Sequence, residues 1–177
     1  YYNANRSYDS TQPAKKLIVG RASDSISLDP GNTTDMDSVK VTVNIFETLV
    51  KYEKDGKEIV PGLATSWKST EDGLTWVFRL RQGVRFQDGT LCDAYAVEFN
   101  FHRWMYKDDP YHNGQFSYWN YVFGGFPGFV KSVTALNSYS LEIKLSKPYA
   151  PFLSSLAMPV FGIVSPESIK KYGDEVY

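Results

Sequence analysis

The chain has 177 residues, of which 42% are apolar and 22% are charged, and its formal net charge is -1 at pH 7. This balance excludes a largely disordered chain and a nucleic-acid-binding protein that depends on strong positive charge. No apolar run approaches the roughly 20 residues that a membrane-spanning helix needs, and the single cysteine, Cys92, excludes an intramolecular disulfide.

The chain begins with a polar segment, residues 1–16, which we expect to be a flexible lead. The apolar residues 17–22 follow and predict a short buried strand. Residues 39–50 then carry valine and phenylalanine at helical spacing, and Asp35 or Asp37 is expected to cap that helix.

Hairpins and capped helices are expected over the remainder of the chain. Asp55-Gly56 predicts a tight turn within residues 50–60, and the alternation from Trp76 to Leu80 predicts a half-buried strand. The other expected elements are a helix capped by Asp93 with Val97, Phe101 and Trp104 on one face, a long structured loop over 107–128, strands at 130–136 and 140–145, a helix at 151–158, a strand at 160–164 and a helix started by Ser165. Strands, hairpins and helices mixed in this order indicate an α/β (mixed α+β) fold.

The residues show no catalytic constellation. His102 and His112 are ten positions apart and lack the neighbouring ligands of a zinc motif. Cys92 has no basic residue nearby and is expected to be a structural thiol. The glycine-rich residues 124–128 lack the Gly-Lys-Ser/Thr ending of a phosphate-binding loop, so a turn is the better interpretation.

Aromatic residues are unusually frequent, with 4 Trp, 13 Tyr and 11 Phe. Many of them gather in residues 111–123, inside the expected loop. Two interpretations stay open for this cluster. It forms either a small satellite core beneath the loop or a wall against which a ligand binds.

Several motifs in order make the chain similar to a known family, the extracellular solute-binding proteins of family 5, which serve peptide and nickel ABC importers in bacteria. The second half is more similar to the dipeptide-binding members. The similar stretches are 17–20 with 27–30, 45–50 with Tyr52 and Asp55-Gly56, 60–67, 71–90, 110–112, 150–153 and 156–158.

This resemblance implies the N-terminal part of a type II periplasmic-binding-protein-like fold with a small extra lobe, and the second major lobe absent. Family members are about three times as long as this chain. By analogy, residues 17–46 begin the first lobe, residues 47–165 form the inserted extra lobe, and residues 166–177 return into the first lobe.

The resemblance also implies where a peptide is contacted. The backbone of Thr33, Thr34, Asp35 and Met36 is expected to run beside the bound peptide, and Tyr111 matches a tyrosine that contacts ligand in a relative. The implied protein has no catalytic residue, metal or cofactor. Its implied partners are a peptide ligand and an ABC permease in the cytoplasmic membrane, with no nucleic acid, and it is expected to be a monomer.

The expected location is the periplasmic or extracellular face of the cell membrane, either free or held by a lipid anchor. Two other functions remain open. A family member that binds a nickel chelate or haem is one, because His102 and His112 are available. A secreted hydrolase or interaction domain is the other, and it would need a catalytic constellation in a cleft.

Overall fold

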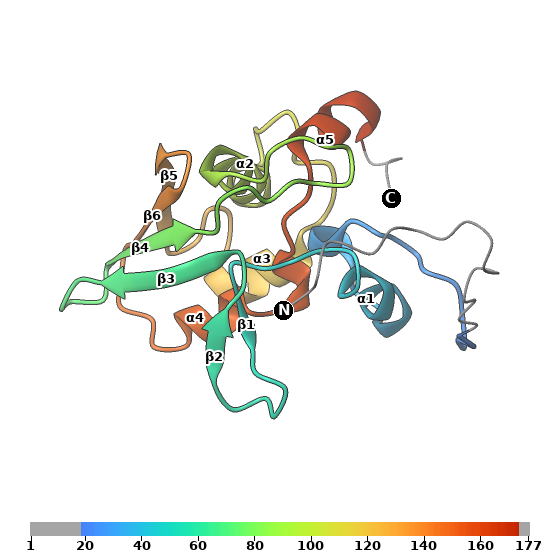
Figure 1. Ribbon diagram of the computed structural model, residues 1–177, viewed down its shortest axis with the longest axis horizontal. Coiled ribbons are helices and arrows are strands. Elements are labelled where there is room, and N and C mark those ends of the chain that lie inside the picture. Colours follow the sequence, from blue (N-terminus) through green and yellow to red (C-terminus); the bar gives the residue numbers. More distant parts are fainter. Residues whose placement is uncertain (1–18, 174–177) are drawn as a thin grey trace, which may run out of the picture.

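A computed structural model describes residues 19–173, and a four-stranded antiparallel sheet is its largest element (Figure 1). The strand order is β3-β4-β6-β5. These strands span β3 Ala64–Ser69, β4 Thr75–Leu80, β5 Val130–Asn137 and β6 Ser140–Leu145. The predicted strand at 76–80 and the predicted pair at 130–136 and 140–145 are therefore confirmed.

One face of this sheet is apolar and buried. Phe78 on β4 lies opposite Leu141 on β6, and both side chains are fully buried. Val133 lies opposite Ile143 on the same face. Because side chains alternate along a strand, the neighbouring residues, such as Arg79, point to the other face, which is polar. The sheet therefore has a single core-facing side.

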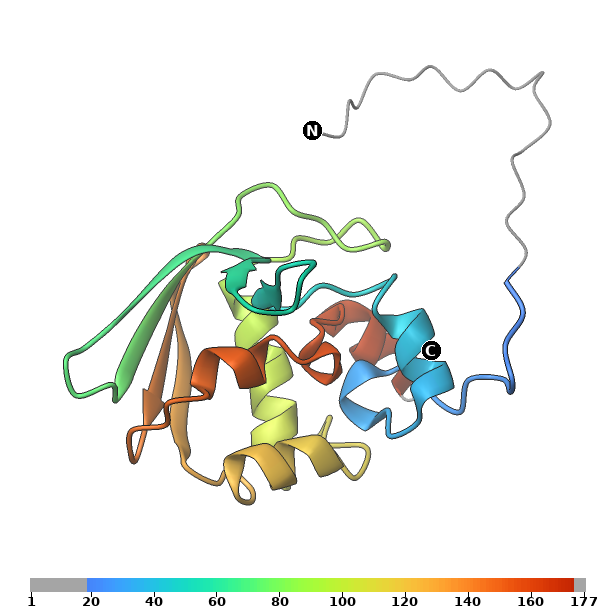
Figure 2. The ribbon, with the colours of Figure 1, turned by 90° about the horizontal axis from the view of Figure 1, so that it is seen from below.

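Helix α2, Ala94–Met105, packs on that apolar face against β5 and β6 (Figure 2). Its N-terminus is capped as predicted, because the Asp93 side chain accepts a hydrogen bond from the Ala96 N–H. The predicted apolar face of this helix is confirmed too, since Val97, Phe101 and Trp104 are buried.

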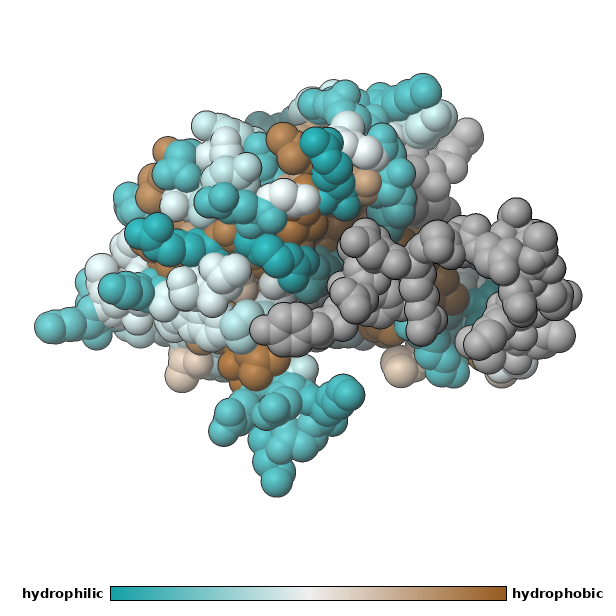
Figure 3. All heavy atoms as spheres, viewed as in Figure 1, coloured by the Kyte–Doolittle hydropathy of each residue, from teal (hydrophilic) through white to brown (hydrophobic). Residues whose placement is uncertain are grey.

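Short elements surround this sheet and helix. Helix α1 is capped by Asp35 and helix α5 by Ser165, as the sequence predicts. The turn between β1 and β2, residues 53–58, projects from the body as a hydrophilic tip (Figure 3). The bounds are α1 Met36–Thr42, α3 Ser117–Phe123, α4 Phe152–Leu156 and α5 Pro166–Tyr172, the 3-10 helices η1 Pro30–Asn32 and η2 Pro159–Phe161, and the hairpin strands β1 Val50–Tyr52 and β2 Ile59–Pro61.

Two expectations near the N-terminus are wrong in part. Residues 19–22 form no strand, and the flexible lead and residues 17–18 lie outside the described residues. The predicted helix over 39–50 begins earlier, at Met36, and ends at Thr42. It ends there because β-branched residues weaken a helix and because the Asn44 side chain bonds the Lys40 carbonyl oxygen, which turns the chain.

The expected loop over 107–128 contains a helix that the sequence prediction missed. Trp119 and Phe123 are one helical turn apart in α3 and both are buried. Gly124 ends this helix in the left-handed conformation, with φ 76°. The predicted strand at 160–164 is wrong as well. Pro159 begins a 3-10 turn that runs to Phe161. After it, Ile163 donates a single backbone hydrogen bond to the Glu47 oxygen, which does not make a strand pair.

Helix α1 has an inverted burial pattern. Its buried side chains are those of Ser38 and Thr42, whereas Met36 and the following Val43 are 68% and 47% exposed. No apolar residue of α1 is therefore fully buried in the core. Within the described part of the chain, no helix is long and apolar enough to cross a membrane.

Asn100 joins α2 to the segment before α5. Its side chain is fully buried, donates to the Val164 carbonyl oxygen at 2.8 Å and accepts from the Val164 N–H at 3.2 Å. The same amide also donates to the Ala96 carbonyl oxygen at 2.8 Å. Both backbone groups of Val164 thus depend on one side chain.

We expect Asn100→Leu to lower the free energy of unfolding by about 3 kcal/mol, because the substitution buries two backbone groups without partners. Chemical denaturation of the 177-residue chain measures this change. The matched control is Asn120→Leu, which lies on the exposed side of α3 and should shift stability by about 0.5 kcal/mol or less. Equal effects of the two substitutions would contradict the role assigned to Asn100.

Candidate functional site

Four of the predicted ligand contacts lie in one segment, residues 29–36, which we call the strap. Thr33 and Asp35 have extended backbone, with ψ angles of 131° and 150°. The Thr33 side chain is buried, and its hydroxyl donates to the Pro30 carbonyl oxygen at 2.8 Å. Thr34 and Met36 are exposed, so the strap presents them, and not Thr33, to the surroundings.

The strap has a free backbone edge at Thr34. Thr33 N–H donates to Pro30 and the Asp35 oxygen accepts from Val39, but neither backbone group of Thr34 has a partner among the described residues. The Asp35 side chain is occupied, since it accepts from the Ser38 N–H at 2.8 Å. Hydrogen bonding with the Ser38 side chain, and next with the Ser38 N–H, lowers the Asp35 pKa, so the carboxyl stays ionised.

Tyr111, the fifth predicted contact, lies half-buried at the start of the aromatic loop, residues 111–116, which leads into α3. Its N–H donates to the Asp109 carboxylate at 2.8 Å, and its ring packs against the Phe99 ring with centroids 5.2 Å apart. Phe99 belongs to α2, so a helix in the core holds the position of Tyr111.

Asn32 connects the strap to the loop that carries Tyr111. Its amide nitrogen donates to the Asn113 carbonyl oxygen at 3.0 Å, and its amide oxygen accepts from the Phe116 N–H at 3.4 Å. At Gly114, a Cβ atom would lie 2.1 Å from that amide oxygen, so only glycine fits there. The structure therefore places the two predicted contact segments side by side.

A buried ion pair lies beneath this junction, and sequence reasoning missed it. Both carboxylate oxygens of Asp29 lie 2.6 Å from the Arg103 Nη2 atom. Arg103 is fully buried, and the side chain of Asp29 is 7% exposed. The guanidinium also lies 5.2 Å from the centre of the Phe116 ring. The sequence offers no signal that pairs Arg103 with a residue 74 positions away.

Three of the rings in residues 111–123, those of Phe116, Trp119 and Phe123, are buried. They belong to the same core as the sheet and α2, so these three form neither a separate satellite core nor a wall for a ligand. The two histidines bond to backbone: His102 Nε2 lies 3.1 Å from the Val133 oxygen and His112 Nδ1 lies 2.7 Å from the Arg103 oxygen. Among residues 19–173, no group of three His, Cys, Asp or Glu residues is arranged to hold a metal ion.

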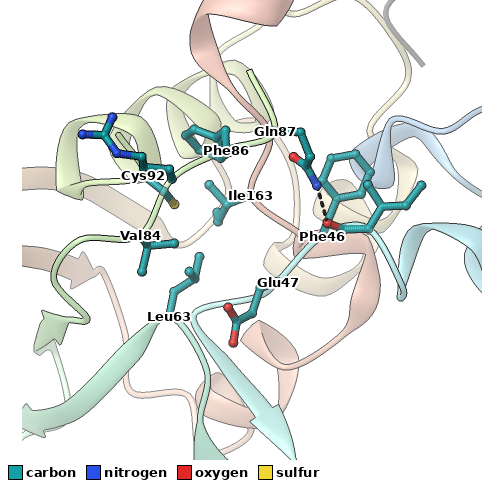
Figure 4. Close-up of a pocket in the computed structure, with 10 residues that line it drawn as sticks. Phe46, Glu47, Leu63, Val84, Phe86, Gln87, Cys92 and Ile163 are labelled. Atoms are coloured by element: carbon teal, nitrogen blue, oxygen red, sulfur yellow. Dashed lines mark hydrogen bonds between the residues drawn. The ribbon is translucent and has the colours of Figure 1, made fainter. Parts of the chain in front are cut away.

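A pocket of about 120 Å³ includes Cys92 in its lining (Figure 4). Phe46, Val84 and Ile163 contribute apolar walls, and Gln87 reaches across it to donate to the Ile45 carbonyl oxygen at 3.2 Å. Burial, followed by the nearby charges of acidic residues, raises the pKa of the Cys92 thiol to about 12. The thiol is therefore a core group and not a nucleophile, as the sequence predicts.

We expect native Cys92 to resist iodoacetamide at pH 8, because with a pKa of about 12 only about one thiol in ten thousand is ionised. In denaturant the thiol returns to its ordinary pKa and should react within minutes. Mass spectrometry of the alkylated chain at timed intervals measures both rates. Rapid labelling of the native protein would contradict this assignment.

The structure thus combines a one-faced sheet, a helix packed on it, and a strap that lies beside the loop of Tyr111. The family model for bacterial extracellular solute-binding proteins, family 5 Middle, matches residues 58–176. The chain belongs to this family.

Individual relatives support the same assignment. The chain is 32% identical to the "Probable D,D-dipeptide-binding periplasmic protein DdpA" of Escherichia coli K12 over 90% of its length, and 30% identical to an E. coli glutathione-binding protein, GsiB, over 92%. It spans 30% of the length of each of these relatives.

Solved structures show the fold. The periplasmic binding protein DppA of Helicobacter pylori, solved in complex with the peptide STSA, is 34% identical and superposes with a TM-score of 0.78. That match covers 86% of this chain and 32% of the other. HbpA2 of Haemophilus parasuis is 30% identical with a TM-score of 0.77. The chain thus corresponds to about a third of a type II periplasmic-binding-protein-like fold, as predicted.

Proposed function

We propose that the protein containing this chain is the substrate-binding receptor of an ABC importer and that it captures dipeptides or oligopeptides. The observation that carries this proposal is the extended backbone at Thr33 and Asp35, next to the loop of Tyr111. Between them, the Thr34 backbone has no hydrogen-bond partner among residues 19–173. The family and the likeness to a binding protein solved with a bound peptide support it.

The strap geometry suits a peptide because an extended peptide has its own unpaired N–H and C=O groups. The Thr34 backbone can exchange hydrogen bonds with those groups whatever the peptide's side chains are. The exposed Met36 and the half-buried ring of Tyr111 would then contact side chains beside that backbone. A second lobe closing over the peptide would exclude water and supply charge partners for its termini.

The division into lobes remains part of this proposal. Residues 17–46 begin the first lobe, residues 47–165 form the extra lobe and residues 166–177 return to the first. The inverted burial of α1 supports this division, because Met36 and Val43 are exposed, as expected if their partners belong to the first lobe.

The proposal includes a role and a location. The receptor performs no chemistry, works as a monomer outside the cytoplasmic membrane, with or without a lipid anchor, and delivers its peptide to a permease in that membrane. The strap and Tyr111 offer backbone groups and a phenol, which recognise a ligand without a catalytic acid-base pair.

Mass spectrometry of ligands that co-purify with the full-length protein tests the ligand class. We expect short peptides in the denatured extract. A nickel chelate or haem in place of peptide would contradict the proposal and favour the other branch of the family.

We expect Tyr111→Ala in the full-length protein to weaken peptide binding about tenfold, because the ring would lose its contact with ligand. Isothermal titration calorimetry with a co-purified peptide measures the affinity. The matched control is Tyr121→Ala on α3, whose side chain is 82% exposed and belongs to neither segment of the site. Unchanged affinity in Tyr111→Ala would remove this tyrosine from the site.

We also expect the 177-residue chain alone to bind peptide with a dissociation constant above roughly 1 mM, because the closing lobe contributes much of the burial. Calorimetry on the isolated chain measures this directly. A micromolar constant, or about -8 kcal/mol, would show that the described lobe holds the whole site.

A further inference from the structure

Helix α2 holds both predicted contact segments on the same face. Phe99 and Arg103 are four residues apart, so their side chains lie one turn apart, about 6 Å along the helix axis. Phe99 contacts the ring of Tyr111, and Arg103 binds the Asp29 carboxylate of the strap. The rigid helix therefore sets the distance between the strap and Tyr111.

A second set of contacts ties the two segments directly. Asn32 donates to the Asp29 carboxylate at 3.2 Å and to the Asn113 carbonyl oxygen at 3.0 Å. Gly114 leaves room for the Asn32 amide, and the Phe116 N–H donates to the oxygen of that amide. Strap, loop and helix thus form a closed arrangement in which no segment can shift alone.

The energetics of the Asp29–Arg103 pair favour a positioning role over a stabilising one. Burying two charges costs several kcal/mol per ion, and an apolar pair of similar volume is often as stable. Arg103 is also incompletely satisfied, since its Nε and Nη1 atoms are buried without a hydrogen-bond partner. Such a pair is a poor source of stability, but it accepts only one arrangement of its partners.

Backbone strain at Phe116 also favours a positioning role. Phe116 has φ 40° and ψ 46°, a left-handed conformation that is unfavourable for a residue with a bulky side chain. Its ring is buried against Arg103 and against His112, with centroids 4.8 Å apart in the second contact. The strained turn aims the loop at the strap, and the buried ring holds it there.

We propose that the Asp29–Arg103 pair, together with Asn32, is a positioning device that fixes the strap relative to Tyr111 and thereby sets peptide affinity. This inference rests on the proposed function, because the effect is read out as peptide binding. Asp29, Arg103 and Asn32 are positioning residues and need not touch the ligand.

The first experiment removes both charges in the full-length protein with the double substitution Asp29→Asn/Arg103→Met. Asparagine keeps the oxygen that accepts from the Gly31 N–H, and methionine keeps much of the buried volume. The matched control is Glu47→Gln/Arg81→Met, which removes an ion pair whose side chains are 35% and 45% exposed. Peptide affinity by calorimetry and the thermal unfolding midpoint are measured for both.

We expect the Asp29/Arg103 variant to unfold within a few degrees of the wild type and to bind peptide at least about tenfold more weakly. The control should match the wild type in both measurements. A second variant, Asn32→Ala, keeps the ion pair and releases the loop, and it should weaken binding in the same direction.

A double-mutant cycle separates positioning from a general loss of structure. If the pair acts through the spacing to Tyr111, Tyr111→Ala should weaken binding clearly less in the Asp29/Arg103 variant than in the wild type. Additive effects would overturn the inference, and so would unfolding of the Asp29/Arg103 variant or wild-type affinity in it. If the wild type itself binds no peptide, the proposed function is wrong and the inference falls with it.

Discussion

Helix α2 is packed between the apolar face of the sheet and the segments predicted to contact ligand, and the structure depends on this packing. Its buried apolar residues, Phe101 and Trp104 among them, join the core that the strands enclose. Asn100 connects the helix to the segment before α5. Phe99 packs against Tyr111 in the aromatic loop, and Arg103 binds Asp29 in the strap. One helix thus connects the sheet to the two segments of the proposed binding site.

The strap shows how the side chains and the backbone of a segment can have separate roles. The Thr33 hydroxyl bonds within its own turn and the Asp35 carboxylate caps α1, so both side chains have structural partners. What remains available is the extended backbone around Thr34. A receptor that contacts a peptide through backbone can accept many sequences, because the contacts do not depend on the peptide's side chains.

Local features of the structure could be predicted from the sequence, because short-range chemistry determines them. Asp35, Asp93 and Ser165 each cap a helix, and Asp55-Gly56 lies in the turn of the first hairpin. Helix α3 was missed because its aromatic residues obscure the apolar period. The Trp119 and Phe123 pair and the following Gly124 were the available signal.

Contacts between distant segments could not be predicted in the same way. Asp29 and Arg103 form their pair across 74 positions, and each looks like an ordinary charged residue in the sequence. The five predicted contact residues came from a family resemblance, and the structure brings their two segments together through Asn32, which was not among them. The sequence alone could not identify this junction, because the Asn32 side chain bonds a residue 81 positions away.

The most direct test of the central claim is a crystal structure of the full-length protein with a bound peptide. The account predicts that the peptide backbone exchanges hydrogen bonds with the Thr34 backbone and that the Tyr111 ring contacts the same peptide. A peptide bound away from both the strap and Tyr111 would contradict it.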